Sequence, residues 1–287
     1  MFFIRLFSKL PFPIIYLISD IIAFFTGSII RYRRTVITQN VETAFPGISA
    51  KEKRKIIRGF YRNLCDVGFE SLKSLSMSKE DVKKHITITN PEEFKKYHDA
   101  GKPILMMTGH LSNWEWQLMA YTVIMNAPIG AVYKPLSNKF SENLMQKIRS
   151  NFGGYVVPME KTMREILVKH KRGEVFTIGM VADQSPPGYD KKQIWLDFFG
   201  KESAFFAGPE KVTEFMNYPV IFSKIRRVKR GYYEITIVDL HDGSDYEKGS
   251  NEILKKFSKQ VEENIKEQPS NWLWSHKRWK YTREEVA

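Results

Sequence analysis

The segment from Gly109 to Glu115 holds a histidine and a carboxylate close enough in sequence to act together. His110 follows an apolar run at 104–107, which is typical of a buried strand that ends in a Gly-His turn. A histidine can take a proton from a hydroxyl group near neutral pH, and a neighbouring carboxylate fixes the tautomer of its ring. This pattern allows general-base chemistry, in which His110 would be the base and Glu115 would orient it.

The spacing of these two residues restricts how they can meet. Five residues along a helix turn through about 500°, so the two side chains do not share a face inside one helix. They meet if His110 lies in the turn before a helix and Glu115 lies in its first turn. Ser112 and Asn113 are suitable N-cap residues, and the helix N-terminus would supply donors to a developing oxyanion. The alternative is a capping box in which Glu115 bonds only to the backbone of Ser112.

Metal chemistry receives little support from the sequence. A zinc-protease helix needs two histidines four residues apart and a further ligand, and the segment around His110 has one histidine. The only cysteine, Cys65, lies in an expected helix and excludes an internal disulfide framework and any Cys-based metal cluster. We therefore expect no bound metal.

The charge balance points to an anionic partner. Lys and Arg number 45 against 32 Asp and Glu, which gives a formal net charge of +13. This balance favours nucleic acid, anionic lipid headgroups or an acidic carrier protein, although a solvated surface would have the same composition. Aromatic residues make up 14% of the chain, which suits a protein that handles apolar surfaces.

Residues 10–30 form an apolar stretch that is long enough to cross a bilayer, with Asp20 as its one charged residue. Basic residues stand on both sides of it, which fits a segment whose two ends lie near an anionic cytoplasmic surface. Asp20 and two prolines weaken a simple span. The stretch is predicted to be a membrane anchor, either spanning or interfacial, rather than a core helix.

The segment after the anchor is predicted to be helical. Helical periodicity covers 35–75 and is broken by a turn at 46–47, and Ser49 with Glu52 resembles a capping box at the start of the second helix. Residues 78–101 are polar and are expected to form a small helical lead-in, with a helix start at 91–93.

From residue 103 onward, strands alternate with helices, which predicts an α/β fold with a mixed, mainly parallel sheet flanked by helices. The strands are expected at 104–108, 129–133, 155–157, 175–182, 194–199, 219–227 and 231–240. The helices are expected at 112–126, 138–151, 160–172, 206–217 and 246–267. We divide the chain into a membrane anchor at 1–34, a helical lead-in at 35–102 and an α/β catalytic domain at 103–287.

Several blocks, in the same order along the chain, resemble the lipid A late acyltransferases, the lauroyl and myristoyl transferase family of His-x4-Asp/Glu acyltransferases. The first block is Gly109-His110-x-x-Asn113-Trp114-Glu115. The others are 40–46, 132–135 with 149–153, 182–184 with 198–200 and 208–209, and 268–280. The resemblance covers nearly the whole chain. Lys134, where the family often has arginine, and the loop 185–190 depart from it and leave the exact acceptor open.

The resemblance implies a membrane-bound acyltransferase of lipopolysaccharide biosynthesis. It would move a fatty acyl chain from an acyl thioester on acyl carrier protein to a hydroxyl of a lipid A precursor. His110 would take the hydroxyl proton, Glu115 would orient His110, and the freed oxygen would attack the thioester. No covalent acyl-enzyme and no cofactor beyond the thioester co-substrate are implied. The implied location is the inner membrane of a Gram-negative bacterium, with the catalytic domain facing the cytoplasm.

Six residues are candidates for substrate binding. Arg149 would stabilise the oxyanion or hold a phosphate, and Asp183 would orient a basic or hydroxyl group. Each has a structural alternative: a surface charge on a helix for Arg149, and a turn residue after a strand for Asp183. The full set of candidates is Asn113, Lys134, Arg149, Asp183, Lys277 and Arg278.

The closing segment 272–280 interleaves tryptophans with cations, which suits a membrane headgroup region or a nucleic-acid backbone. His276 within it is a weaker candidate for a second base. Two other functions stay open: acyl transfer to another lipid acceptor (a lysophospholipid, an aminolipid or another glycolipid), and a non-enzymatic basic protein. If the chain were a non-enzymatic basic protein, its ordered match to the family's sequence blocks would be a coincidence. We therefore expect acyl carrier protein, an anionic glycolipid and the membrane as partners, and no nucleic acid.

Overall fold

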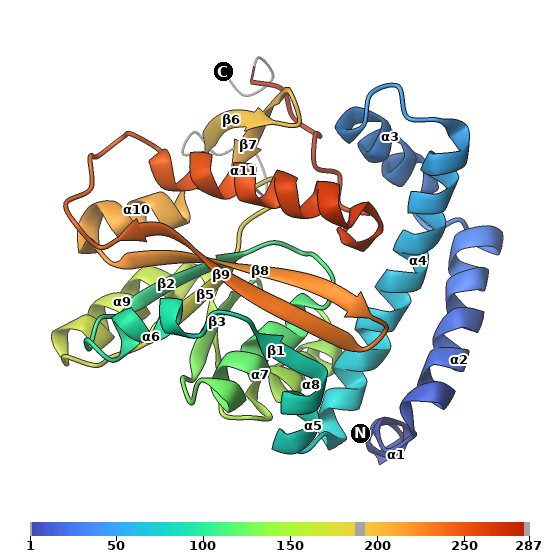
Figure 1. Cartoon of the computed structure of the whole chain (residues 1–287), viewed down its shortest axis with the longest axis horizontal. Coiled ribbons are helices and arrows are strands. Elements are labelled where there is room, and N and C mark those ends of the chain that lie inside the picture. The colour runs from blue at the N-terminus through green and yellow to red at the C-terminus, as the bar shows by residue number, and fades with distance from the viewer. Residues whose placement is uncertain (1, 187–192, 284–287) are drawn as a thin grey trace.

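A seven-stranded mixed sheet forms the centre of the protein in the computed structural model, which describes residues 2–186 and 193–283. The strands lie in the order β1-β9-β8-β2-β5-β3-β4 (Figure 1). They are β1 (Ile86–Ile88), β2 (Ile104–Thr108), β3 (Ile129–Tyr133), β4 (Tyr155–Pro158), β5 (Thr177–Val181), β8 (Pro219–Lys229) and β9 (Tyr232–Asp242). The mixed, mainly parallel sheet expected from the sequence is therefore confirmed.

The central strands are parallel and buried. β2 pairs in parallel with both β5 and β8, and β3 pairs in parallel with β5 and β4. The long β8–β9 hairpin is antiparallel. All five residues of β2 are buried because helices cover both faces of the sheet. Burial on two faces explains why this strand is a nearly continuous apolar run instead of an alternating one.

Helices form a layer on each face of the sheet. α11 packs against β8 and β9 on one face, and α7 packs against β1 and β3 on the other (Figure 1). The helices of this part of the chain are α5 (Lys79–His85), α6 (Glu92–His98), α7 (Trp114–Ile124), α8 (Lys139–Ser150), α9 (Thr162–Lys171), α10 (Gly208–Met216) and α11 (Glu252–Glu267). Each element expected in 103–267 is present, with ends displaced by a few residues.

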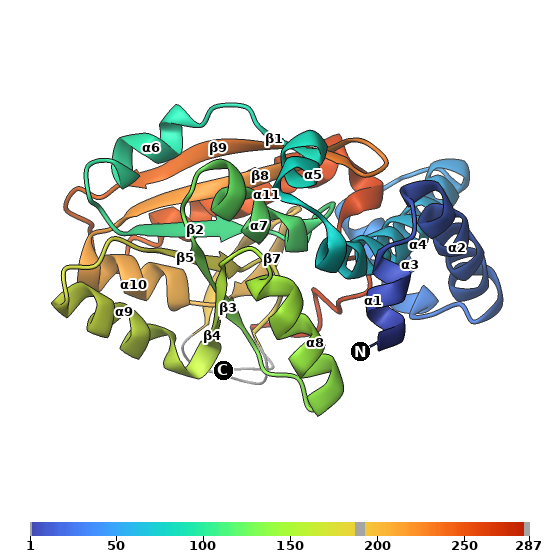
Figure 2. The ribbon, with the colours of Figure 1, turned by 90° about the horizontal axis from the view of Figure 1, so that it is seen from below.

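The helices of the first quarter of the chain lie together at one end of the sheet, as Figure 2 shows. They are α1 (Phe2–Ser8), α2 (Phe12–Phe24) with its π-helical continuation η1 (Phe25–Ile29), α3 (Arg34–Ala44) and α4 (Ala50–Lys73). The expected capping box is present, since Ser49 and Glu52 exchange hydrogen bonds at the start of α4. The helix break at 46–47 is likewise where the sequence predicted it.

α2 packs on α4 with one face only. Small or short side chains four residues apart are buried against α4, namely Ile15, Ser19, Ala23 and Gly27. The Tyr16 hydroxyl donates to Glu70 and the Ser19 hydroxyl to Asp66, so the two helices run antiparallel. Phe12–Ile29 is long and apolar enough to be a candidate membrane span, and 11% of it is buried.

Two elements differ from the sequence prediction. The segment 78–101 was expected to be helical, but it also contributes β1, which pairs with β9. A strand at 201–205 was not expected. It is β7 (Lys201–Phe205), which forms a two-stranded antiparallel sheet with β6 (Ile194–Phe198). Both residues of the connecting turn, Phe199 and Gly200, have positive φ, and Gly200 was the available hairpin signal.

Candidate active site

Two adjacent parallel strands bring His110 and Asp183 together. Thr108 at the end of β2 is paired with Val181 at the end of β5. The backbone NH of Ala182 donates to the carbonyl of Thr108 at 3.1 Å, which extends the pairing beyond the strands. His110 lies two residues after Thr108, and Asp183 lies two residues after Val181. Carboxyl ends of parallel strands meet at one edge of the sheet, which is where α/β proteins commonly bind ligands.

Asp183 holds the His110 ring in one orientation. Its carboxylate accepts one hydrogen bond from the ring Nδ1 of His110, at 2.7 Å, and another from the backbone NH of His110, at 3.0 Å. The indole of Trp272 donates to the same carboxylate at 2.7 Å. Asp183 is fully buried, and Gly109 leaves room for the Leu111 side chain, since a Cβ at 109 would lie 2.7 Å from it. With Nδ1 carrying the proton to Asp183, Nε2 is the unprotonated ring nitrogen that can accept a proton.

The charge of Asp183 is stabilised by these contacts. Burial alone would raise the pKa of the carboxyl, but the attraction of His110 and the hydrogen bonds from His110 and Trp272 outweigh it. Together they lower the pKa of Asp183 to about 2. Asp183 is therefore ionised throughout the physiological range and can stabilise an imidazolium on His110.

Glu115 is bound to Arg149 instead of His110, which differs from the pairing expected from the sequence. The guanidinium of Arg149 donates to both carboxylate oxygens of Glu115, at 2.9 and 2.6 Å. Glu115 lies in the first turn of α7 as expected, but its carboxylate meets a residue of α8. The physical reason is that Asp183, from the neighbouring strand, already occupies the Nδ1 side of His110. The two hydrogen bonds to Glu115 raise the pKa of Arg149 against the effect of burial.

Asn113 is a buried structural residue in this arrangement. Its side-chain oxygen accepts the backbone NH of Trp116 at 3.2 Å and so caps α7. Its amide nitrogen donates to the buried carboxylate of Glu70 at 2.7 Å. Asn113 is fully buried and fixes the start of the helix that carries Glu115, so it acts on position and does not touch the pocket. Asn113 is the N-cap of α7, so the alternative capping box between Ser112 and Glu115 is not formed.

A pocket of about 630 Å³ opens beside His110. Its polar lining includes His110, Glu115 and Arg149, and Lys134 and Lys280 also line it. The apolar wall is formed by Met106, Leu118, Ile129, Ala131, Met145 and Met180. The pocket thus joins a proton acceptor, an ion pair and a long apolar surface, which is the usual composition of a site for a largely apolar ligand.

The closing segment is part of the core, which corrects the headgroup interpretation of its tryptophans. Trp272 and Trp274 are 2% and 0% exposed, and Trp272 bonds to Asp183. Arg278 is also buried; its guanidinium lies over the rings of Phe198 and Phe205 and donates to a backbone carbonyl. The sequence pattern could not separate an interfacial from a buried tryptophan, because both positions favour large aromatic rings.

Two candidate cations of this segment do not line the pocket. Lys277 is exposed, and Arg278 is 1% exposed beneath the surface. Burial lowers the pKa of Arg278 to about 10, against the attraction of Asp183. His276 does line the pocket, and its Nε2 accepts the backbone NH of Ser185 at 3.1 Å. Burial lowers the pKa of His276 to about 4, so this ring is neutral near pH 7.

The sequence did not reveal that Asp183 is the partner of His110. The two residues are 73 positions apart, and the signal that joins them is the pairing of two buried strands that end in Gly-His and Ala-Asp. Asp183 was a candidate for orienting a basic group, whereas Gln184 was not a site candidate; the Gln184 amide nitrogen lies 3.4 Å from Nε2 of His110. Within 2–186 and 193–283, no group of three or more His, Cys, Asp or Glu residues is placed to hold a metal ion.

Comparison with known proteins matches this chain over almost its full length. A sequence profile of the family described as bacterial lipid A biosynthesis acyltransferase matches residues 1–281. Two similar proteins are the lipid A biosynthesis palmitoleoyltransferase of Escherichia coli (strain K12) and the lipid A biosynthesis acyltransferase of Shigella flexneri. Each is 21% identical over 278 residues, which cover 96% of this chain and 88% of the relative. The similarity therefore includes both the N-terminal helices and the sheet with its pocket.

Proposed function

The chain belongs to the bacterial lipid A biosynthesis acyltransferase family and is an acyltransferase; from this premise we propose its substrates and mechanism. It transfers a fatty acyl chain from the thioester of acyl carrier protein to a hydroxyl of a lipid A precursor. It works at the inner membrane of a Gram-negative bacterium, with the pocket facing the cytoplasm. The relatives' names support the acceptor class, and the basic surface suits both an anionic glycolipid and an acidic carrier protein.

The observation that carries the mechanism is the His110–Asp183 pair beside an apolar pocket. His110 Nε2 takes the proton of the acceptor hydroxyl while that oxygen attacks the thioester carbonyl. Asp183 holds the Nδ1 proton and stabilises the imidazolium that forms. When the tetrahedral intermediate collapses, the carbon–sulfur bond breaks and the imidazolium returns the proton to the leaving thiolate. One ester forms and one thiol leaves, with His110 restored.

Glu115 acts through Arg149. The bidentate pair fixes the guanidinium on the pocket wall, where it stabilises negative charge that develops on the carbonyl oxygen. Glu115 is thus a positioning residue for a cation. Lys134 and Lys280 add two further cations on the same lining and suit a phosphorylated acceptor. Arg149 therefore takes the oxyanion role, and the lysines take the phosphate role.

The apolar wall of the pocket receives the acyl chain of the donor. Met106, Leu118 and Met180 lie on it, and a flexible methionine wall fits an unbranched chain without polar contacts. A covalent acyl-enzyme is not part of the proposal. Burial raises the pKa of the Cys65 thiol to about 11, so it is a poor nucleophile, and it does not line the pocket.

A mass-resolved acyl-transfer assay tests this function. Membranes that contain the protein are given acyl carrier protein loaded with mixed chains, together with an under-acylated lipid A precursor. We expect the precursor to gain the mass of one acyl chain. His110→Ala should lower the rate by about 10²- to 10⁴-fold, the usual contribution of a general base. A His110-dependent gain on a lysophospholipid but not on the precursor would contradict the acceptor, and no His110-dependent transfer would contradict the mechanism.

A further inference from the structure

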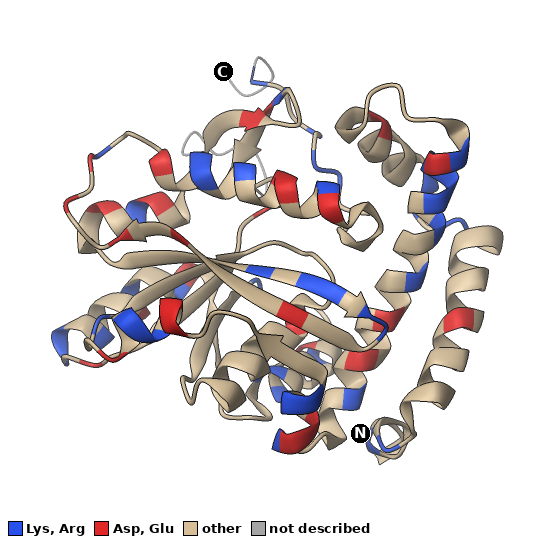
Figure 3. Cartoon of the chain, viewed as in Figure 1, with Lys and Arg blue, Asp and Glu red and all other residues tan. Residues whose placement is uncertain are grey.

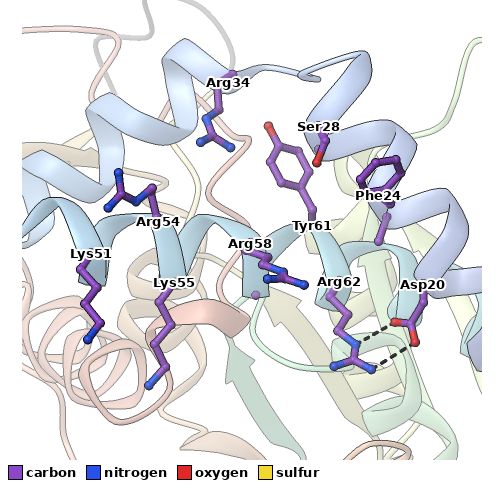
Figure 4. A pocket seen from close by; sticks show the side chains of 13 residues that line it. Asp20, Phe24, Ser28, Arg34, Lys51, Arg54, Lys55, Arg58, Tyr61 and Arg62 are labelled. Carbon is purple, nitrogen blue, oxygen red and sulfur yellow. Dashed lines mark hydrogen bonds and ion pairs between the residues drawn. The ribbon is translucent and has the colours of Figure 1, made fainter.

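A second hollow lies between α2 and α4, and it shares no lining residue with the catalytic pocket. It is an open groove of about 1100 Å³ (Figure 4). Its lining is unlike the apolar catalytic pocket, because cationic side chains dominate it. The residues around it are Asp20, Ala23, Phe24, Gly27, Ser28, Arg34, Lys51, Arg54, Lys55, Arg58, Gly59, Tyr61 and Arg62.

One face of α4 supplies most of the positive charge of this groove. Five cations recur at spacings of three or four residues and so lie along one side of the helix: Lys51, Arg54, Lys55, Arg58 and Arg62. We call these five residues the α4 cationic stripe. Figure 3 shows the concentration of basic residues in the first half of α4. Arg34, from α3, lies on the opposite side of the groove in Figure 4.

Most of this charge has no partner within the described part of the chain. Asp20 is the one carboxylate among the groove's lining residues, and its carboxylate pairs with Arg62 at 2.8 Å and with Arg230 at 2.8 Å. Among the ion pairs of residues 2–186 and 193–283, none includes Arg54 or Arg58. Like charges four residues apart destabilise a helix. A stripe of this kind therefore favours an anion that comes from outside the chain.

Contacts beside the groove fix the spacing of α2 and α4. Gly27 allows α2 to touch the Tyr61 ring, since a Cβ at 27 would lie 2.7 Å from it. The Tyr61 hydroxyl donates to the carbonyl of Tyr32 at 2.8 Å, and the Ser19 hydroxyl donates to Asp66 at 2.6 Å. Because these contacts fix the separation of the two helices, the cations stand around a preformed concave surface.

The outer face of α2 beside the groove is apolar and exposed. The large side chains here include Leu17, Ile21 and Phe24 of α2 and Phe25 of η1, which are between 46% and 61% exposed. An exposed apolar helix face next to cations is typical of a helix that lies in the membrane interface. If α2 crossed the hydrocarbon while docked on α4, it would carry the α4 cationic stripe with it, which is unfavourable. The geometry thus favours α2 lying along the interface, with the stripe at the depth of the lipid phosphates.

We propose that the groove between α2 and α4 binds the phosphate group of an anionic membrane lipid. Arginine predominates among its cations, and the guanidinium forms paired hydrogen bonds with phosphate oxygens. A phosphate headgroup enters a concave groove whose rim is the apolar face of α2, whereas a folded acidic protein would contact only its edges. The inference rests on the proposed function only in placing the enzyme at a membrane; it does not depend on the chemistry at His110.

Flotation of the full-length protein with phosphatidylcholine vesicles that contain increasing fractions of phosphatidylglycerol tests the proposal. The variant combines Arg54→Gln and Arg58→Gln. The matched control combines Arg164→Gln and Lys171→Gln, which removes the same charge from exposed positions on α9. A basic residue near the surface contributes about fivefold to the binding of an anionic membrane. We expect the phosphatidylglycerol-dependent part of vesicle binding to fall about thirtyfold in the Arg54 and Arg58 variant. The same quantity should change little in the control.

Three outcomes would overturn the proposal. The first is an equal dependence on phosphatidylglycerol in the variant and the control. The second is glycerol phosphate binding in detergent that depends on Arg54 and Arg58 while vesicle binding does not, which would assign the groove to a soluble phosphate ester. The third is that the Arg54 and Arg58 variant binds acyl carrier protein more weakly in detergent while its vesicle binding depends on phosphatidylglycerol as in wild type. That result would make the groove a docking site for the carrier protein.

Acyl transfer in neutral detergent separates this inference from the proposed function. The Arg54 and Arg58 variant should keep the wild-type rate there, because neither residue lines the catalytic pocket. A retained rate also shows that the variant is folded. If the wild-type protein transfers no acyl chain but still binds vesicles according to their phosphatidylglycerol content, the proposed function is contradicted and the lipid site is not.

Discussion

The catalytic pocket and the groove between α2 and α4 treat charge in opposite ways. In the pocket, His110 is paired with Asp183, and Glu115 is paired with Arg149. In the groove, Asp20 is the one carboxylate among the lining residues around the α4 cationic stripe. Internal pairing fixes the position of groups that must meet a reacting atom. Unpaired charge on a fixed surface is instead available to an anion from outside. The two hollows are therefore suited to chemistry and to membrane attachment, respectively.

A buried carboxylate connects the two regions. Glu70 of α4 accepts hydrogen bonds from Tyr16 of α2, Asn113 at the start of α7 and Tyr233 of β9, at 2.8, 2.7 and 2.6 Å. Burial raises the pKa of Glu70. The apolar helix on the outside and the start of the helix that carries Glu115 are thus hydrogen-bonded to the same side chain.

Side-chain volume should matter in the pocket and not in the groove. Ala131→Phe places a ring on the apolar wall, so kcat/KM for the longest accepted donor should fall about 10- to 200-fold, with a smaller loss for shorter donors. Ser28→Phe adds a similar ring to the groove and should leave the donor preference unchanged. Competition between mixed acyl donors, read by mass, measures both. An unchanged preference in Ala131→Phe would show that the acyl chain lies elsewhere.

The pocket should also give the protein a pH-dependent stability. The pKa of His276 is lowered by burial from 6.5 to about 4, so between these values the unfolded chain binds a proton that the folded chain does not. Stability therefore falls as the pH drops from 6.5 to 4, by about 2 to 3 kcal/mol after allowance for partial exposure. His276→Gln keeps an acceptor for Ser185 but cannot titrate. Its denaturation midpoints should decline less over this range, and parallel pH curves for the two proteins would contradict the argument.

Removal of one arginine should have different costs in the two regions. Arg149→Gln leaves the largely buried carboxylate of Glu115 without its cation, so it should lower the free energy of unfolding by about 1 to 3 kcal/mol. Arg58→Gln relieves repulsion within the α4 cationic stripe, so it should change that free energy by no more than about 0.5 kcal/mol, in the stabilising direction. Thermal unfolding in neutral detergent compares them. Equal losses would mean that both charges are internally paired.

The sequence predicted the sheet well because its signals are local. The strands at 104–108 and 129–133 have the predicted ends, since an apolar run bounded by turn residues defines each of them. β7 was not predicted, because Lys201–Phe205 has two polar residues at its start and is stabilised by pairing with β6. A short strand of this kind depends on its partner more than on its own composition.

The site was predicted in part: the sequence identified the proposed catalytic histidine but not its partner, which lies far away along the chain. The local motif identified His110, but it assigned the nearby Glu115 as its partner. The structure pairs His110 with Asp183, 73 residues away, because strand register decides which side chains meet at the sheet edge. The tryptophans of the closing segment were expected to suit a headgroup region or a nucleic-acid backbone, because composition alone does not distinguish the core from an interface.

The rate of acyl transfer by Asp183→Asn and Glu115→Gln, measured side by side with wild type, tests the central claim most directly. If Asp183 fixes the tautomer of His110, Asp183→Asn should lower kcat by about 10²- to 10⁴-fold with little change in KM. Glu115→Gln should have a smaller effect on kcat, because it acts through Arg149. The opposite order, with Glu115→Gln inactive and Asp183→Asn near wild type, would contradict the account and return the catalytic pair to His110 and Glu115.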